Sequence, residues 1–457
     1  MHLTKTGAAS KSAFCMLFNS SDRFDDTIGK NIYCIPKSSE QFILYAPLHG
    51  MVLLVNDAYI DCFKGALCGD SASITSLGID NKIIEGLTSC PPQIQNRVQP
   101  KWPPNFRPTN LTLFLTHKCT LRCTYCYCEG GKGNTMPWRT AESAILYTIA
   151  NAVKSKKKTL GLHFHGGDIG ASWDLFQKAV NFARRQCQQN GIQCKIDLGT
   201  NAVYSKSQAV FIAKNIDGAT VSLDGMPSVH NAYRILPDGT PSLPHVLKTL
   251  STFDRYGLNY AIRMTVTADT VDKLPLNIKY ICTNTPAKKI RAEPMYTRGR
   301  ASTKKIDAPP AQEFIDKFRE AKQIADQYNR QLAYSGARIG HQFCTFCSYV
   351  EPTFGVTPEG HLTACYEVLN ASDELADQFF YGHMSQECEV EANHQKITKM
   401  RNNAYLNRAN CEGCFCYWDC AGDCAAKAQH QATGHDKIPE RCFITRELTK
   451  DILLTMV

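Results

Sequence analysis

The sequence predicts an α/β protein whose centre is a partial (β/α)6 barrel of the TIM type, with a small α+β domain before it and a cysteine-rich domain after it. Two observations support this fold class. Apolar runs of strand length alternate with helix-length stretches from residue 111 to 294, and a proline-rich connector and a cysteine-dense tail flank that region. The predicted segments are 1–104 for the N-terminal domain, 105–305 for the barrel, 306–341 for a linker helix and 342–457 for the tail domain.

The N-terminal domain is predicted from its best-patterned stretch, residues 41–57. Two apolar runs there flank a Pro-Leu-His-Gly break, which predicts a β-hairpin. A helix is expected over 58–67. Six prolines between residues 90 and 108 then predict a domain boundary.

The central region contains six candidate strands separated by helix-length stretches. Six units over about 190 residues fit an incomplete barrel better than a complete eight-unit one. In such barrels the functional groups lie at the C-terminal ends of the strands. A polar helix is expected over 311–331. The candidate strands cover residues 111–116, 160–165, 195–200, 219–224, 261–267 and 289–294.

The amino-acid composition excludes several classes of protein. The chain has 457 residues, 22 cysteines and 43% hydrophobic residues, so it is neither a disulfide-stapled miniature nor a disordered chain. No apolar run approaches the ~18 residues of a membrane span, and the N-terminus lacks a secretory signal. We therefore expect a cytoplasmic protein without a membrane partner. In a reducing compartment, cysteines in this number indicate metal or redox chemistry.

The first cysteine group follows the first predicted strand and reads C-x3-C-x2-C, at Cys119, Cys123 and Cys126. Three thiolates on one loop suit an iron–sulfur cluster or zinc, because both prefer soft sulfur ligands. Cys128 lies too near to Cys126 to share a cluster corner easily. Three protein ligands leave one iron of a four-iron cluster open.

This loop resembles the signature of the radical S-adenosylmethionine (SAM) superfamily, C-x3-C-x-aromatic-C, with Tyr125 as the aromatic residue. The resemblance implies that SAM binds the open iron and that an electron from the cluster cleaves it to methionine and a 5′-deoxyadenosyl radical. That radical abstracts a hydrogen atom from the substrate. The three cysteines are thereby implied as cluster ligands and catalytic residues.

Three further segments match the superfamily in order. Residues 165–168 resemble its Gly-Gly-Glu-Pro segment with the shorter Asp168 in place of Glu, and residues 200–202 resemble Thr-Asn-Gly. Residues 221–234 resemble the Ser-Leu-Asp-Gly…His…Arg stretch of peptide-modifying members. The resemblance implies cofactor contacts at Tyr125, Gly166, Gly167, Asp168, Asn201 and Ser222, and a contact of Arg234 with SAM or with the substrate.

Arg263 is a further candidate, inferred from strand alternation. In residues 261–267, Ile262, Met264 and Val266 alternate with Arg263 and two threonines, so one set faces the helices and the other the barrel interior. A buried arginine needs an anionic partner. The carboxylate of SAM and the side chain of Glu293 both fit, and the sequence leaves the choice open.

The tail carries the second cysteine group. Residues 411–424 read C-x2-C-x5-C-x3-C and a further cysteine follows, while residues 360–365 give G-x4-C after two upstream cysteines. This pattern resembles the SPASM domain, which implies two auxiliary clusters and thus three [4Fe-4S] clusters in all. A pair of zinc sites is the alternative. The implied ligands are Cys344, Cys347, Cys365 and Cys424 for one cluster, and Cys411, Cys414, Cys420 and Cys442 for the other. The alternative for the first of these clusters is that Cys347 is not a ligand and one iron is open to substrate.

Residues 43–63 resemble the start of a winged-helix-like RiPP recognition element, a domain that binds the leader of a ribosomally made peptide as an added strand. A structural cap on the barrel is the alternative. With the other matches, this implies a radical SAM/SPASM peptide maturase that installs a carbon–sulfur or carbon–carbon cross-link. The enzymatic alternative is an anaerobic sulfatase-maturing, formylglycine-forming enzyme, and the non-enzymatic one is an iron–sulfur electron-transfer protein.

The expected partners follow from this reading. They are a precursor peptide and a low-potential electron donor such as flavodoxin or ferredoxin. The basic run at residues 154–158 lies between a helix and the second strand, where a solvated loop is expected. We therefore expect no nucleic-acid partner despite the net charge of +9.

Overall fold

The computed structural model describes residues 27–29, 31–70, 80–88, 105–127, 133–340, 345–347, 353–406, 408, 411–428 and 439–457. The chain forms two compact units that interleave along the sequence. Unit 1 comprises Met1–Pro103, Ser335–Cys347 and Asn402–Val457, and unit 2 comprises Pro104–Tyr334 and Ser348–Arg401. The predicted N-terminal segment and most of the cysteine-rich tail thus share one unit, although they stand at opposite ends of the sequence.

Unit 2 is built on an eleven-stranded sheet in the order β11-β10-β9-β8-β7-β6-β5-β12-β13-β14-β15. Every neighbouring pair from β11 to β12 is parallel, and the pairs from β12 to β15 are antiparallel. The strands are β5 Asn110–Leu113, β6 Thr159–Phe164, β7 Gln193–Thr200, β8 Gly218–Ser222, β9 Tyr260–Val266, β10 Lys289–Pro294, β11 Gln331–Ala333, β12 Thr353–Val356, β13 His361–Thr363, β14 Phe380–Met384 and β15 Val390–Ala392.

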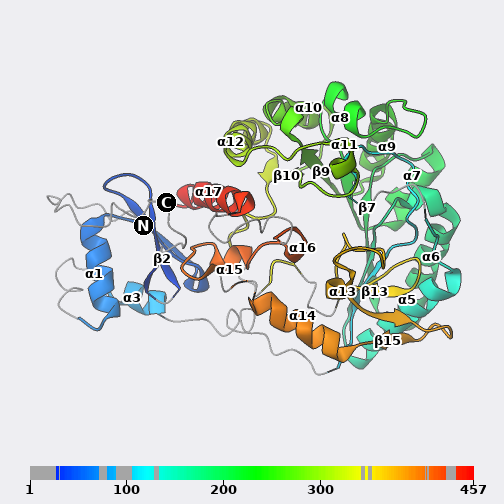
Figure 1. The fold of residues 1–457 in the computed structure, drawn as a ribbon, viewed down its shortest axis with the longest axis horizontal. Helices are drawn as coiled ribbons and strands as arrows, with labels where there is room; N and C mark the ends of the chain where they lie inside the picture. The colour runs from blue at the N-terminus through cyan, green and yellow to red at the C-terminus, as the bar shows by residue number, and fades with distance from the viewer. Residues whose placement is uncertain are drawn as a thin grey trace. The chain divides into compact units, whose positions relative to one another are not determined.

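The helices between the parallel strands lie along the outer side of the sheet (Figure 1). Local signals fix their ends: Ser205 and Gln208 form a capping box at the start of α7, and Gly257, with φ +71°, ends α9. The helices of this unit are α5 Trp138–Lys154, α6 Trp173–Gln189, α7 Lys206–Asn215, α8 Pro227–Tyr233, α9 Leu243–Tyr256, α10 Leu274–Asn284, α11 Arg300–Lys304, α12 Ala311–Gln327 and α13 Ala376–Phe379, and α14 His394–Leu406 begins in it.

All six predicted strands are present as β5 to β10, which confirms a mixed α/β fold with a large parallel sheet. The expected polar helix at 311–331 is too long. Helix α12 ends at Gln327 because Asn329 takes a left-handed conformation (φ +53°), and residues 331–333 instead pair with β10 as β11.

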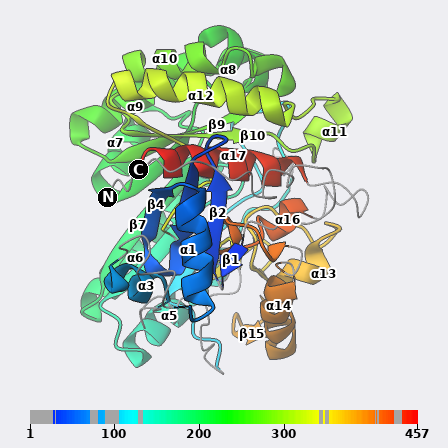
Figure 2. The ribbon, with the colours of Figure 1, turned by 90° about the vertical axis from the view of Figure 1, so that its left-hand side faces the viewer.

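Unit 1 contains a four-stranded antiparallel sheet in the order β1-β2-β3-β4. The predicted hairpin is formed by β3 and β4, joined by the turn Pro47–His49, and Asn56 caps the predicted helix. Helix α1 lies along the sheet in Figure 2. The elements of the unit are β1 Thr27–Gly29, β2 Ile32–Pro36, β3 Phe42–Ala46, β4 Met51–Val55, α1 Asp57–Leu67, α3 Asn81–Thr88, α15 Tyr417–Cys420, α16 Ala425–Ala428 and α17 Glu440–Leu454.

Both faces of this small sheet are buried, which explains why the two ends of the sequence share a unit. One face, including Leu44, packs on α1 and α3. The other face, including Ile43 and Tyr45, packs on the 414–420 cysteine segment and on Leu453 of α17. Because strand side chains alternate between faces, β3 contributes to both cores.

Most of the proline-rich connector lies outside the described residues. None of the described helices is long and apolar enough to cross a membrane.

Candidate functional site

The first cysteine group lies on the loop that follows β5, at the C-terminal edge of the parallel strands. Backbone hydrogen bonds hold this loop to segments that follow other strands. The amide of Arg122 donates to the carbonyl of Ile235 (2.8 Å), and that of Thr124 donates to Tyr233 (2.9 Å). The carbonyl of Cys126 accepts from the amide of Arg300 (3.0 Å). The loop is therefore positioned by residues after β8 and β10.

The Gly-Gly-Asp segment after β6 lies against the same loop. The amide of Gly167 donates to the carbonyl of Thr116, and the amide of Asp168 donates to the carbonyl of Lys118. Each of these hydrogen bonds is 3.0 Å long. A Cβ at Gly167 would lie 1.9 Å from the Lys118 carbonyl oxygen, so only glycine fits there. Gly166, with φ +114°, makes the turn that places this segment against the cysteine loop.

The carboxylate of Asp168 accepts hydrogen bonds from neighbouring residues of the same site. One carboxylate oxygen accepts from Gly170 N (2.9 Å) and from the hydroxyl of Tyr204 (3.1 Å), and the other accepts from Thr200 Oγ1 and Asn201 N (both 3.1 Å). Burial raises its pKa although these donors oppose the rise. A carboxylate has about four acceptor sites, so Asp168 is occupied in fixing the 200–204 loop. Sequence reasoning missed Tyr204, which no motif marks.

The Thr-Asn-Ala loop after β7 reaches the first thiol. Asn201 Nδ2 donates to Thr120 Oγ1 (2.9 Å) and to the sulfur of Cys119 (3.5 Å). Ala202 has φ +58°, a conformation that favours glycine, which agrees with its place in a Thr-Asn-Gly-like segment.

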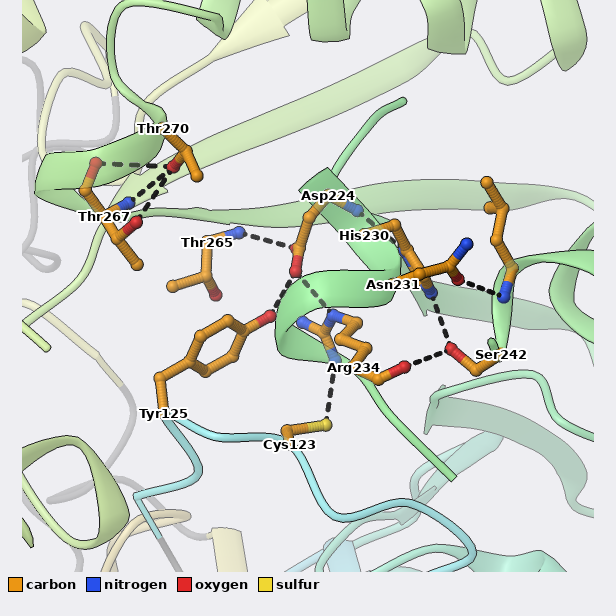
Figure 3. A network of polar contacts seen from close by, with 11 residues as sticks. Cys123, Tyr125, Asp224, His230, Asn231, Arg234, Ser242, Thr265, Thr267 and Thr270 are labelled. Carbon is orange, nitrogen blue, oxygen red and sulfur yellow. Dashed lines mark hydrogen bonds and ion pairs between the residues drawn. The ribbon is translucent and has the colours of Figure 1, made fainter. Parts of the chain in front are cut away.

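A buried polar network joins the second thiol to the segment after β8 (Figure 3). The carboxylate of Asp224 accepts from the Tyr125 hydroxyl, from Arg234 Nε (2.8 Å) and from Thr265 N (3.0 Å). Arg234 Nη1 donates to the sulfur of Cys123 (3.9 Å), and its guanidinium lies 5.3 Å from the centre of the Tyr125 ring. Burial alone would raise the pKa of Asp224, but the Arg234 guanidinium holds it below its usual value.

His230 supports this network from α8. Its Nδ1 accepts from the amide of Asp224 (3.3 Å), its Nε2 bonds Ser242 Oγ (3.0 Å), and Ser242 donates to the Arg234 carbonyl. Burial lowers the pKa of His230 to about 4, so the imidazole is neutral at pH 7. The Asp-Gly pair at residues 224–225 could be read from sequence as a simple turn, whereas Asp224 is the acceptor around which the network forms.

The three thiols of the loop influence one another. Burial raises the pKa of Cys119 to about 12, and Asp168, Cys123 and Cys126 add to the effect. Burial also raises the pKa of Cys123 to about 11, although Arg234 opposes the rise. In the described part of the chain, no three His, Cys, Asp or Glu side chains converge closely enough for a single metal ion. Three thiols on one loop are the soft donor set that a polynuclear iron–sulfur cluster takes, with each thiolate on a different iron.

Arg263 lies in β9, in register with Ser222 of β8. Ile262, Met264 and Val266 are buried and Arg263 is half-buried, as the alternation predicted. Burial would lower the pKa of Arg263, but the charge of Glu293 nearby raises it. Among the described residues, its guanidinium forms no ion pair within 4.0 Å. Glu293 is therefore an electrostatic partner of Arg263 rather than a contact ion pair.

His163 in β6 and His165, directly after this strand, are neutral at pH 7, and His165 lies near Arg263. Burial lowers the pKa of His163 to about 4 and that of His165 to about 3, where Arg263 contributes. Tyr366, which directly follows Cys365, stacks on His163 with ring centres 5.6 Å apart, and its hydroxyl oxygen accepts a hydrogen bond from Thr112 Oγ1 (3.1 Å). These aromatic and polar side chains were not anticipated from sequence.

The tail cysteines divide between the two units. Cys411, Cys414, Cys420 and Cys442 belong to unit 1 and interact electrostatically, so the structure brings this predicted ligand set together. Of the other predicted set, Cys347 and Cys424 belong to unit 1 and Cys365 to unit 2, while Cys344 lies outside the described residues.

The cysteines outside these sets have separate surroundings. Cys416 is buried in the core shared with the four-stranded sheet, and Cys388 is half-buried. Cys128 lies outside the described residues.

Curated relatives match only part of the chain, and no protein-family model matches it. An uncharacterized protein of Methanocaldococcus jannaschii is 27% identical over 177 residues, which are 38% of this chain and 58% of that protein. The cysteine-type anaerobic sulfatase-maturating enzyme of Clostridium novyi is 25% identical over 166 residues, or 34% and 44% of the two chains. The chain thus spans about half of the length of these relatives.

Solved structures match more of the chain at lower identity. Native anSMEcpe with bound AdoMet gives a TM-score of 0.59 at 16% identity, covering 76% of this chain and 98% of that one. Streptococcus suis SuiB bound to S-adenosylmethionine gives 0.50 at 13% identity, covering 90% and 98%. The chain has the mixed α/β fold, built on a large parallel sheet, of these two SAM-bound proteins.

Proposed function

We propose that this protein is a radical SAM enzyme of the SPASM type that modifies a ribosomally made precursor peptide. The observation that carries the proposal is the loop at residues 119–126. Its three cysteines lie at the C-terminal edge of the parallel strands, and Asn201 and Arg234 direct donors at two of the sulfurs. The SAM-bound proteins of the same fold support the choice of cofactor.

In this proposal, Cys119, Cys123 and Cys126 hold a [4Fe-4S] cluster at the end of a partial barrel. When bound, the cluster supplies the electron that cleaves SAM to the radical that abstracts a hydrogen atom from the peptide. Residues 166–168 and 200–202 fix the shape of the loop through the contacts of Gly167 and Asp168. Tyr125, Ser222, Asn201 and Arg263 remain candidates for SAM contacts.

Arg263 is the strongest of these candidates. It is half-buried, it carries a permanent charge, and within the described residues it has no contact ion pair. A carboxylate beside it would gain a bidentate partner. We propose that Arg263 binds the SAM carboxylate while Glu293 stabilises its charge from a distance.

The substrate side of the proposal rests on the known peptide complexes and on unit 1. A solved structure titled "Native anSMEcpe with bound AdoMet and Cp18Cys peptide" has a TM-score of 0.58 to this chain at 18% identity. Strand β4 pairs with β3 on one side and, among the residues that the structure describes, is the last strand of its sheet. We propose that a leader peptide adds to β4, as in a RiPP recognition element.

The remaining parts of the proposal are two auxiliary clusters in the cysteine-rich tail, a flavodoxin- or ferredoxin-like electron donor and a reducing cytoplasm. The product would be a carbon–sulfur or carbon–carbon cross-link in the peptide. A second candidate function is formylglycine formation, which the sulfatase-maturating relatives favour.

The first test is anaerobic incubation of the reconstituted protein with SAM and dithionite. We expect methionine and 5′-deoxyadenosine in equal amounts. Their absence from a protein that carries its full iron content would reject the enzyme and leave an electron-transfer role.

The second test separates the two substrates. Mass spectrometry compares a short peptide encoded beside this gene with a cysteine-containing sulfatase peptide. If only the neighbouring peptide changes, by the loss of two hydrogens, the result supports the peptide maturase. If only the sulfatase peptide changes in mass, the result supports formylglycine formation.

Leader binding is tested by hydrogen exchange. With the precursor peptide present, we expect slower exchange in β4 (Met51–Val55) than in the same protein alone, because an added strand protects edge amides. Unchanged exchange in a saturated complex would reject this site. Deleting the N-terminal region is a poorer test, because β3 also forms the core around Cys414 and Cys420.

A further inference from the structure

We propose that Arg234 sets the reduction potential of the cluster held by Cys119, Cys123 and Cys126, and that Asp224 and Tyr125 position it for this purpose. This inference rests on the proposed function. It assigns Arg234 to a cluster thiolate, whereas the sequence resemblance implied a contact with SAM or with the substrate.

The geometry points to the sulfur. Arg234 is 8% exposed, and its Nη1 donates to Cys123 Sγ over 3.9 Å. Asp224, which is 1% exposed, holds the opposite side of the guanidinium through Nε (2.8 Å), so the group cannot turn away without removing the cation that pairs with a buried carboxylate. The Tyr125 ring lies under the guanidinium, and its hydroxyl donates to the same carboxylate.

The charges predict a direction. Hydrogen bonds to cluster sulfurs and nearby charges are the main means by which a protein tunes an iron–sulfur potential. A guanidinium is always charged, and in a buried site its field is weakly screened. Arg234 therefore stabilises the reduced cluster, which carries the additional electron. Asp224 opposes this effect, but it lies behind Arg234 as seen from the sulfur.

The test is an EPR-monitored redox titration of the cluster signal that SAM perturbs. In Arg234→Met we expect a tenfold lower ratio of reduced to oxidised cluster at a fixed potential. For a one-electron couple this corresponds to a reduction potential that is about 59 mV more negative. Arg234→Lys should restore most of the potential. Asp224→Asn keeps an acceptor for Arg234 but removes the negative charge, so the shift should be positive.

The matched control is Arg446→Met. Arg446 Nη1 donates to Cys414 Sγ in the tail motif (3.3 Å), so the same loss of charge occurs beside a different thiolate. We expect the SAM-perturbed signal to keep its potential in this variant.

Two results would overturn the inference. One is an unchanged potential in Arg234→Met together with weaker SAM binding, which would make Arg234 a SAM ligand. The other is a shift of equal sign in Asp224→Asn and Arg234→Met, which would show general damage to the site. If wild-type protein gives no SAM-perturbed cluster signal at all, the proposed function fails instead.

Discussion

The loop at residues 119–126 and the motif at residues 411–424 both carry several cysteine thiols, but in different surroundings. In the first, polar side chains from the segments that follow β7 and β8 reach two of the sulfurs, and a buried ion pair lies behind them. In the second, Cys414 and Cys420 belong to an apolar core with Tyr33, Ile35 and Ile43. The difference suggests that the loop is organised for chemistry and that the motif also stabilises the fold.

The strongest test of this contrast removes the loop ligands. With Cys119, Cys123 and Cys126 replaced by Ala, we expect about eight of about twelve irons to remain and SAM cleavage to be abolished. The fold should persist, because these thiols are not part of the core that supports the tail motif. Iron analysis and product assays measure both effects. Retention of about twelve irons would contradict the assignment of this cluster.

The second test disturbs the loop without touching a ligand. Gly167→Ala places a methyl group against the Lys118 carbonyl, so the loop must move and cluster loading should fall by more than half. Gly191→Ala is the control: Gly191 has a positive φ, unlike Gly167, and no atom lies within 4 Å of the added methyl, so this variant carries backbone strain without the clash. The control should lose only about 1 kcal/mol of stability. Equal iron loss in both variants would argue against a specific contact.

The sequence predicted the parts of the site that depend on local order and missed those that depend on packing. The spacing of Cys119, Cys123 and Cys126 and the strand before them could be read directly, since neighbouring residues determine both. The attachment of Arg234 to Asp224 could not, because a buried ion pair forms only after two segments fold together. The burial of β3 against residues 414–420 joins positions more than 360 apart, and no spacing rule marks it.

The third test uses two neighbouring residues of β3. Ile43 and Leu44 are both fully buried, but Ile43 faces the cysteine motif and Leu44 faces α1 and α3. Each change to Ala should cost about 3 kcal/mol in unfolding free energy. Only Ile43→Ala should also lower iron binding at the tail motif, while the SAM-perturbed EPR signal persists. Equal iron loss in the two variants would show that the effect is one of stability alone.

The smallest expected effect is a pH dependence of local stability, confined to the region around the cysteine loop. The pKa of His230 is about 4 in the folded protein, below the ordinary value of about 6.5, so its contribution to stability is present above pH 6.5 and is lost as the pH falls toward 4. From pH 7.5 to 5.5 the opening free energy of the Asp224 amide should fall by about 1 kcal/mol. Hydrogen exchange, corrected for the intrinsic rate, measures it.

His230→Gln should remove most of this dependence, because the amide is neutral throughout. The same variant at pH 7.5 serves as its own reference for any loss of packing. A slope that survives in His230→Gln would assign the pH sensitivity to His163 and His165, which are also held neutral by burial. In that case the acid sensitivity would belong to the face of the sheet that carries Arg263, and the network around Asp224 would be insensitive to pH in this range.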